Sequence, residues 1–402
     1  MKPSAASTTA AWIAWRWATL FWKRMANKKR ILLFGWLPPP VFGPSVAYQA
    51  LLRSDFPKHF DVTFINLSVV SNIRELEQFR VRKLLKLAQF LALELWYLLT
   101  RRFALVCYPI SFNRNAFLKD TVLLGLARAF GVPTVLWAHG TGVARFRETL
   151  SPRLRTRFDQ MVRRSRGVLV LAECLREEFG NLLPLERIRA VTLGIEPAPT
   201  DARHPDGRTI LYVGTLLKAK GIFDLLEAFP TVRACVPEAH LVVAGEWFRA
   251  DEEQATLEWC RRHHLTEAVR FVGPVWGEAK WALLRSADVF VFPPHSRSEA
   301  FGLVLLEAMQ AGVPVVTTRG GARNEMVADG VTGLLAEEQN PSDLAAKILQ
   351  LLTDPLLRER MGRAGRERFL SHYTHEHYGR RMIEALEAFT SEPPDPLPNH
   401  NP

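Results

Sequence analysis

The sequence ADVFVFPPHSRSEAFGLVLLEAMQAGVPVVTT, from Ala287 to Thr318, contains two short apolar segments around a polar turn and a longer apolar segment. Val289–Phe292 and Val313–Val316 have the length and β-branched composition of strands that are buried on both faces. Between them, Phe301–Ala311 is followed by a glycine, which is a typical helix stop. A strand–helix–strand unit of this kind gives parallel strands. The loop His295–Gly302 is therefore predicted at the carboxyl edge of a parallel sheet, where ligands of such sheets bind.

Two carboxylates mark this unit. Glu299 precedes the helix, beside an N-terminus that can receive an anion. Glu307 follows about two turns later, on a helix that is otherwise almost wholly apolar. A single glutamate on a helix usually belongs to its solvated face, but a charge on a buried helix needs a partner. A pair of ligand hydroxyls would be such a partner.

The nineteen residues SEAFGLVLLEAMQAGVPVV, 298–316, resemble the E-x7-E signature of retaining glycosyltransferases of family 4. The resemblance implies the GT-B fold, an α/β fold with two Rossmann-like doubly wound domains that face each other across a cleft. It also implies a glycosyltransferase of the hexosyltransferase type (EC 2.4). Such an enzyme moves a sugar from a nucleotide diphosphate sugar to an acceptor hydroxyl and retains the anomeric configuration. No metal and no cofactor beyond the donor substrate is expected.

The resemblance also assigns candidate site residues, and the glycine-bounded turn at a helix N-terminus that holds Lys218 and Lys220 is itself suited to a diphosphate. The predicted catalytic residues are His139, Lys220 and Glu299. The predicted donor-binding residues are Gly43, Thr215, Lys218, Lys220, Phe301, Gly302, Leu303 and Glu307. Two positions depart from the family pattern, because Pro44 stands where a second glycine is common and Thr215 stands where an arginine is common. Trp276 either stacks on the nucleotide base or belongs to the core.

Composition and charge narrow the possible partners. The length of 402 residues suits two domains. The four cysteines are far apart, none at metal-ligand spacing, and lie in apolar or helical contexts, which indicates inert thiols in a reducing compartment. Residues 1–200 hold 30 Lys and Arg against 13 Asp and Glu, a net charge of +17. This half is expected to meet an anionic partner. No zinc-finger or basic–aromatic RNA motif occurs, so anionic lipid is favoured and no nucleic acid is expected.

Two segments bear on this membrane hypothesis. Residues 1–29 form a Trp-rich leader with a basic end, which suits either the lipid headgroup interface or a poorly ordered terminus. Arg80–Arg102 is either a core helix or an interfacial helix, and the resemblance favours the second reading. No 18-residue uncharged apolar segment occurs. The expected location is the cytoplasm, peripheral to the inner face of the cytoplasmic membrane.

The alternating strand and helix patterns also divide the chain. The predicted parts are a leader at 1–29, an acceptor-side domain at 30–196, a linker at 197–208, a donor-binding domain at 209–370, a helix packing back on the first domain at 371–390, and a disordered tail at 391–402. The predicted role is cell-surface polysaccharide or glycolipid synthesis on a lipid-linked or saccharide acceptor. The alternatives are a catalytically degenerate binding subunit of the same fold and a nucleotide-sugar epimerase.

Overall fold

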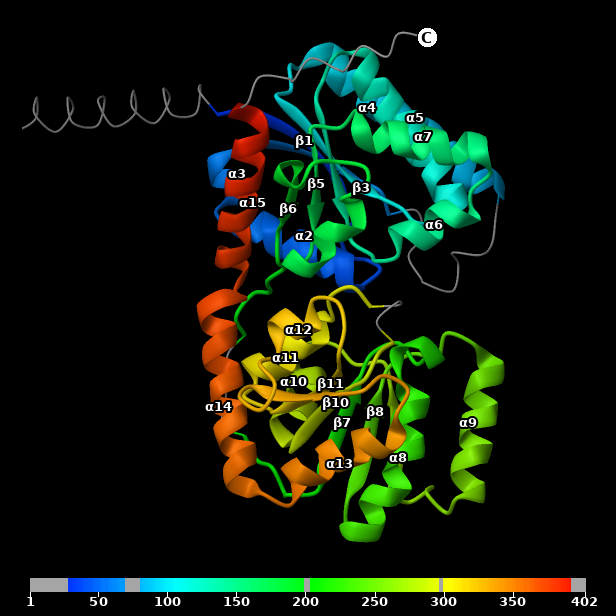
Figure 1. Ribbon diagram of the computed structural model, residues 1–402, viewed down its shortest axis with the longest axis vertical. Coiled ribbons are helices and arrows are strands. Elements are labelled where there is room, and N and C mark those ends of the chain that lie inside the picture. The colour runs from blue at the N-terminus through cyan, green and yellow to red at the C-terminus, as the bar shows by residue number, and fades with distance from the viewer. Residues whose placement is uncertain (1–27, 69–79, 199–202, 296–298, 392–402) are drawn as a thin grey trace, which may run out of the picture.

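The computed structural model describes residues 28–68, 80–198, 203–295 and 299–391 (Figure 1). The predicted leader falls almost entirely outside the described residues, and so does the predicted tail. Figure 1 shows two α/β halves, one above the other, with a pair of helices along one side that spans both. The boundaries that the sequence predicts for the domains and the linker remain predictions.

The N-terminal half is built on a parallel sheet with the strand order β2-β1-β3-β4-β5-β6. Its central strands are buried at every residue, as expected for strands covered by helices on both faces. The strands are β1 (Arg30–Gly35), β2 (Asp61–Asn66), β3 (Leu105–Ile110), β4 (Thr134–Ala138), β5 (Gly167–Val170) and β6 (Ile188–Ala190). The helices are α2 (Gly43–Arg53), α3 (Phe56–His59), α4 (Arg80–Thr100), α5 (Arg114–Ala129), α6 (Val143–Thr149), α7 (Pro152–Arg163) and the 3-10 turns η2 (Glu173–Phe179) and η3 (Leu185–Arg187).

The C-terminal half has a second parallel sheet, with the order β12-β11-β10-β7-β8-β9. Its strands are β7 (Thr209–Val213), β8 (His240–Ala244), β9 (Val269–Gly273), β10 (Val289–Phe292), β11 (Val315–Thr318) and β12 (Gly333–Ala336). Its helices are η4 (Lys218–Lys220), α8 (Ile222–Cys235), α9 (Ala250–Arg262), α10 (Gly277–Ser286), α11 (Leu303–Gln310), α12 (Arg323–Met326), α13 (Pro341–Leu352) and α14 (Pro355–His372). The last helix of the chain, α15 (His375–Ser391), lies against the N-terminal half. The predicted fold class, two parallel α/β sheets, is confirmed.

The strand–helix–strand unit around Glu299 differs from its prediction only at its ends. β11 starts at Val315 rather than Val313, directly after Pro314, which has no N–H to give to the sheet. The helix starts at Leu303 rather than Phe301, because Gly302 has a left-handed φ of +87° that directs the chain into α11. β10 and β11 pair in parallel, as predicted.

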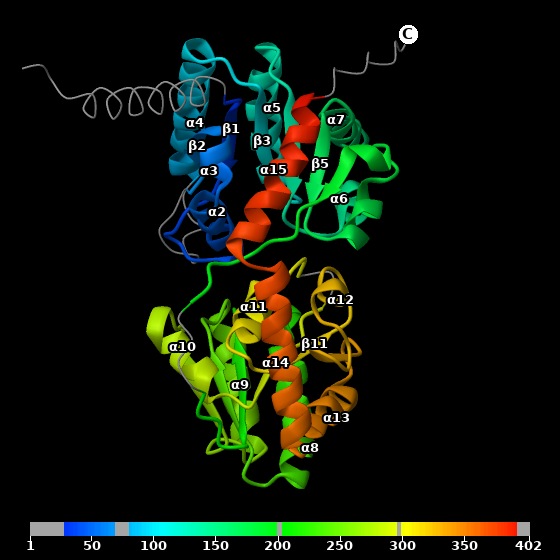
Figure 2. The ribbon, with the colours of Figure 1, turned by 90° about the vertical axis from the view of Figure 1, so that its left-hand side faces the viewer.

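The chain passes between the two halves at two places that pair with each other. Ile195 donates its N–H to the Tyr373 carbonyl at 3.0 Å, and His375 donates to the Ile195 carbonyl at 2.8 Å. A Cβ at Gly194 would overlap the Thr374 carbonyl, so only glycine allows this approach. Beyond the crossing, α15 packs on α2 and α3 of the N-terminal half, while α14 lies along the C-terminal half (Figure 2).

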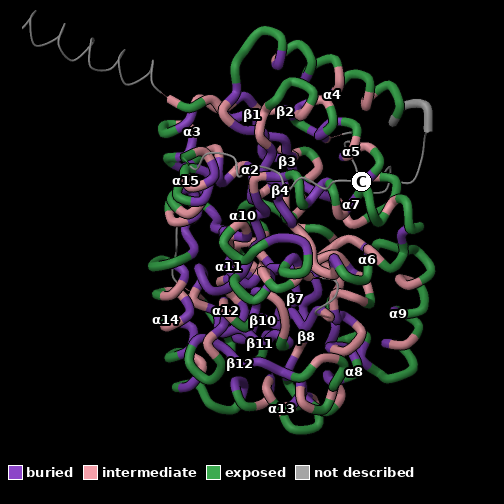
Figure 3. The backbone as a smooth tube through the Cα atoms, turned by 45° about the horizontal axis from the view of Figure 1, so that its top comes forward, coloured by how far each residue is buried: buried purple, intermediate pink, exposed green. Residues whose placement is uncertain are grey.

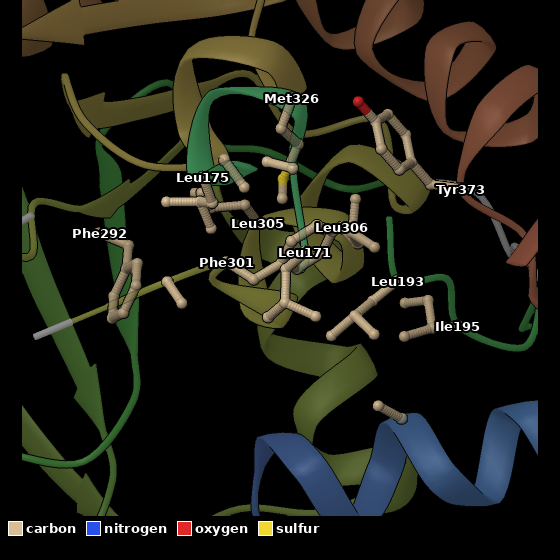
Figure 4. Packing of buried hydrophobic residues seen from close by; sticks show 14 of the residues in the cluster. Leu171, Leu175, Leu193, Ile195, Phe292, Phe301, Leu305, Leu306, Met326 and Tyr373 are labelled. Carbon is tan, nitrogen blue, oxygen red and sulfur yellow. The ribbon is translucent and has the colours of Figure 1, made fainter. Parts of the chain in front are cut away.

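One apolar core runs through both halves. The strands form its centre and the outer faces of the helices are exposed (Figure 3). Where the halves meet, the buried side chains shown in Figure 4 include Leu171, Leu175, Leu193, Ile195, Phe301, Leu305, Leu306 and Met326. Burial of these apolar side chains stabilises the contact between the two halves, since each square ångström of apolar surface removed from water contributes roughly 25 cal/mol.

Candidate active site

A cleft of about 620 Å³ lies between the two halves, where the carboxyl ends of strands from both sheets come together. Nine of the predicted site residues line it: Gly43, His139, Thr215, Lys220, Glu299, Phe301, Gly302, Leu303 and Glu307. Lys218 is the exception, because its side chain is exposed and it is not among the lining residues. The site residues come from four separate parts of the chain, and the two sheets bring them to one cavity.

Glu299 is held by groups that suit an anion. The Lys220 ammonium donates to Oε2 of Glu299 at 2.8 Å. The main-chain N–H groups of Phe301 and Gly302 donate to Oε1 at 3.2 and 3.0 Å. A lysine and two N–H groups at a helix start are also the donors that a phosphate uses. The carboxylate of Glu299 and a diphosphate would therefore compete for one set of donors.

The turn that carries Lys220 is packed closely against the loop after β10. Gly221 has a φ of +78°, and a Cβ there would overlap the Pro293 carbonyl, so the residue after Lys220 has to be glycine. His295 donates its N–H to the Ala219 carbonyl at 3.1 Å, which ties the turn to the same loop. These contacts fix the position of the lysine at the base of the cleft.

Glu307 has a partner that the sequence did not indicate. Lys280, on α10, donates to Oε1 of Glu307 at 2.6 Å, and both residues line the cleft. Lys280 is 27 residues away in the sequence, on a helix with no motif, so no local pattern could predict the pair. Each carboxylate of the E-x7-E segment is thus matched with one lysine. Trp276, which precedes α10, also lines the cleft and is 57% exposed.

His139 faces the cleft from the N-terminal half. Its Nε2 lies 3.2 Å from the Tyr48 hydroxyl, and its ring packs 4.3 Å from Trp137. Nδ1 has no hydrogen-bond partner among the described residues. Burial lowers the pKa of His139 to about 3, because the charged imidazolium is disfavoured away from water. A neutral imidazole at this place can donate or accept a hydrogen bond, but it does not carry a charge.

Gly43 and Pro44 start α2 on the other side of the cleft. A Cβ added at Gly43 would lie 4.0 Å from the Leu303 side chain, so the first turns of α2 and α11 face each other. The ring of Pro44 falls in the first turn of α2, where a missing N–H costs the helix nothing. It does remove one donor that a glycine would present to the cleft.

Arg323 is a further residue that sequence reasoning missed. It is fully buried on α12, and its guanidinium donates to the main-chain carbonyls of Thr318 at 2.9 Å and Glu299 at 3.0 Å. Arg323 therefore fixes the main chain of the Glu299 loop from behind. No motif in the sequence separates this arginine from the many others.

The described part of the chain contains no group of three or more His, Cys, Asp or Glu side chains arranged to hold a metal ion. Within the same residues, no helix is both long enough and apolar enough to cross a membrane. The described residues that line the cleft bring together lysines, carboxylates, a neutral histidine and main-chain N–H groups.

Comparison with known protein families matches the part of the chain that contains Lys220, Glu299 and Glu307. Residues 199–368 match the family model "Glycosyl transferases group 1". Glycogen synthase of Mycobacterium tuberculosis is 34% identical over 262 residues, which are 62% of each chain. Phosphatidyl-myo-inositol mannosyltransferase of Mycobacterium leprae is 38% identical over 175 residues, which are 43% of this chain and 45% of that one. The matches thus cover less than two thirds of these relatives.

Solved structures extend the likeness to most of the chain. Sucrose-phosphate synthase from Thermosynechococcus elongatus aligns with a TM-score of 0.69 and 19% identity, over 90% of this chain and 100% of that chain. HepE of Anabaena, in complex with UDP-glucose, aligns with a TM-score of 0.67 and 17% identity, over 89% and 99%. At these identities the likeness concerns the fold, and it agrees with the GT-B arrangement of the two sheets.

Proposed function

The chain belongs to the group 1 glycosyl transferases (family 4), and we propose that it moves a sugar from a nucleotide diphosphate sugar to an acceptor hydroxyl with retention of configuration. The observation that carries the proposal is the grouping of Lys220, Glu299 and Glu307 in one cleft between two parallel sheets. The predicted identification with this family is confirmed. The reaction, its stereochemistry and its independence from metal are the proposal.

In the proposed mechanism, the departing diphosphate is stabilised by Lys220 and by the N–H groups of Phe301 and Gly302. Charge develops on that group as the sugar–phosphate bond breaks, and donors fixed in a cleft stabilise developing charge without reorganisation. When the donor binds, Glu299 gives up these hydrogen-bond donors to the diphosphate and turns to the hydroxyls of the donor sugar. His139, which is neutral, provides a hydrogen bond to the sugar from the opposite half.

The nucleoside would lie toward α10. Glu307 would accept hydrogen bonds from the ribose, and Trp276 offers an exposed ring for the base. HepE binds UDP and UDP-glucose, as its solved complexes state, and a mannosyltransferase relative in Corynebacterium glutamicum is named for GDP-mannose. The donor class we propose is therefore a nucleoside diphosphate hexose.

We further propose a lipid-linked acceptor and a peripheral position on an anionic membrane. α4 buries Phe90, Glu94 and Leu98 against the N-terminal half. Its other side exposes large apolar side chains, each between 63% and 67%: Leu84, Leu85, Trp96 and Leu99. An apolar helix face beside a positively charged half suits the headgroup region of anionic lipids. The mannosyltransferase relatives are named for a phosphatidylinositol acceptor, which fits this choice.

The proposal is tested by incubating the purified chain with UDP-, GDP- and ADP-hexoses and a membrane extract. We expect release of nucleoside diphosphate with one donor only, and an NMR coupling constant that shows the anomeric configuration of the donor in the product. EDTA should leave the rate unchanged. Binding of a donor without any release would instead support the degenerate binding subunit, and conversion of the sugar without transfer would support an epimerase.

The membrane part has its own test, flotation with vesicles of anionic or neutral lipid. The protein should float with the anionic vesicles, and replacement of Leu85, Trp96 and Leu99 by serine should keep it at the bottom of the gradient. A wild-type protein that stays at the bottom with both lipids would contradict the peripheral position. That result would not contradict the proposed transfer reaction, which is tested separately.

A further inference from the structure

Lys280 lies on the side of the cleft where the proposed function puts the nucleoside. It is in the first turns of α10, four residues after Trp276, and its ammonium donates to Oε1 of Glu307 at 2.6 Å. The side chains of Lys280 and Glu307 are 20% and 13% exposed. Neither the family match nor any relative assigns a role to this lysine.

The pair is more constrained than a surface ion pair. A carboxylate that is 13% exposed, on a helix that is otherwise apolar, loses much of its hydration and needs a partner. Lys280 supplies that partner from a different helix, so the carboxylate is fixed from one side. Among the described residues, only Lys280 donates a hydrogen bond to the side-chain carboxylate of Glu307, and it donates to Oε1. The other oxygen, Oε2, is left for a group inside the cleft.

We propose that Lys280 is a positioning residue for the nucleoside of the donor. By holding Oε1, it orients the Glu307 carboxylate so that Oε2 accepts hydrogen bonds from the ribose hydroxyls. This inference rests on the proposed function, and it deepens it by assigning the ribose contact to a Lys280–Glu307 unit rather than to Glu307 alone. A carboxylate fixed in one orientation distinguishes a ribose from a 2′-deoxyribose better than a freely rotating one, because less order is lost on binding.

The expected result is a loss of ribose preference without a loss of fold. The measurement is calorimetric titration of a nucleoside diphosphate and its 2′-deoxy counterpart. The wild-type protein should bind the deoxy ligand about tenfold more weakly, as expected when a hydrogen bond to a charged group is lost. Lys280→Met should weaken binding of the ribonucleotide by a similar factor and bring the ratio of the two affinities close to one. Lys280→Arg, which keeps a donor to Oε1, should restore part of the ratio.

Three further variants make the test specific. Glu307→Gln alone and together with Lys280→Met should bind equally, because the two residues act as one unit and their effects do not add. Lys347→Met, on α13 and outside the residues that line the cleft, should bind as wild type. Thermal melting identifies variants that fail to fold, and in that event the arginine variant and the deoxy ligand on the wild-type protein carry the test.

The outcomes separate the two proposals. If wild-type protein binds no nucleoside diphosphate, the proposed function is wrong. If it binds one, but Lys280→Met keeps the wild-type ratio of ribose to deoxyribose affinity, the inference about Lys280 is wrong and the proposed function stands. Additive losses for the two single variants would also overturn the inference, since they would show that the lysine acts independently of Glu307.

Discussion

The carboxylate of Glu325 accepts the main-chain N–H of Cys174 at 2.8 Å, and this hydrogen bond joins the two halves of the molecule. The second oxygen of the same carboxylate accepts the N–H of Glu173 at 3.1 Å. Glu325 lies on α12 and the two N–H groups start η2, so a side chain of one half caps a turn of the other. α12 also carries Arg323, which holds the Glu299 carbonyl. The contact between the halves is thus two residues from an arginine that fixes the Glu299 loop.

Glu325→Ala should separate the halves more often and slow the reaction. We expect kcat/KM to fall about tenfold, which corresponds to the roughly 1.4 kcal/mol typical of one or two lost hydrogen bonds to a charged group. The distance between fluorophores on α4 and α9 should become more broadly distributed. Glu367→Ala, at an exposed position on α14, is the matched control and should change neither quantity. An unchanged distance distribution with unchanged kcat/KM would contradict the assignment.

The comparison of sequence and structure shows which features are local. The strand at Val289–Phe292 and the helix stop before Val313 follow from composition over a few residues, and the structure agrees. The hydrogen-bond partners of Glu307 and Glu325 cannot be predicted from local composition. They lie 27 and 151 residues away in the sequence, and the contacts depend on how the helices pack. Lys218 was predicted beside Lys220 from the same local pattern, yet η4 turns it outward. Spacing along the chain does not give side-chain direction on a tight turn.

Glu299→Gln should uncouple binding from turnover. In this structure Glu299 occupies the donors that the proposed mechanism assigns to the diphosphate, and a neutral side chain would compete less well for Lys220. We expect the free nucleoside diphosphate to bind several-fold more tightly, while kcat falls by about a hundredfold or more because the contact to the donor sugar is lost. Calorimetry and steady-state rates check the two effects. Weaker binding of the free diphosphate would exclude competition between Glu299 and phosphate.

Lys220→Ala should act mainly on turnover. The proposed role of Lys220 is to stabilise charge on the departing diphosphate, and loss of one such donor typically lowers kcat about 10²–10³-fold. Glu307→Ala, in contrast, should raise KM for the donor and leave kcat nearly unchanged, because a ribose contact is equally present before and during the reaction. Steady-state kinetics with varied donor separate the two patterns. Full activity in both variants would refute the site assignment.

His139 should make the protein sensitive to acid. Its pKa is about 3 in the folded chain and about 6.5 when unfolded, so below pH 6.5 the unfolded chain binds a proton that the folded chain does not. The stability from this residue is fully present above pH 6.5 and is lost as the pH falls toward 3. His139→Gln, which does not titrate there, should lose roughly 1 to 2 kcal/mol less than wild type between pH 7.5 and pH 5. Urea unfolding at both pH values measures this difference.

The contribution of Glu94 to stability should change with pH in the opposite direction to that of His139. Its side chain on α4 is buried, and neither carboxyl oxygen has a hydrogen-bond partner among the described residues. Burial raises the pKa of Glu94 to about 8, against about 4.5 for an exposed glutamate. Between these values the unfolded chain releases a proton that the folded chain keeps, so the stability from this group falls as the pH rises from 4.5 to 8.

Glu94→Leu removes the titrating group and fills the same apolar position, so it should stabilise the protein at pH 8 by roughly 2 to 4 kcal/mol. At pH 5 its advantage should shrink to less than about 1 kcal/mol, because the carboxyl is then neutral in the folded chain and the pH is only slightly above its pKa of about 4.5 in the unfolded chain. Glu94→Gln, which keeps the shape but not the titration, should have a stability that changes less with pH than that of wild type. Urea unfolding across pH 5 to 8 tests these slopes. Parallel curves for wild type and Glu94→Gln would mean that the carboxyl is hydrated or paired in solution.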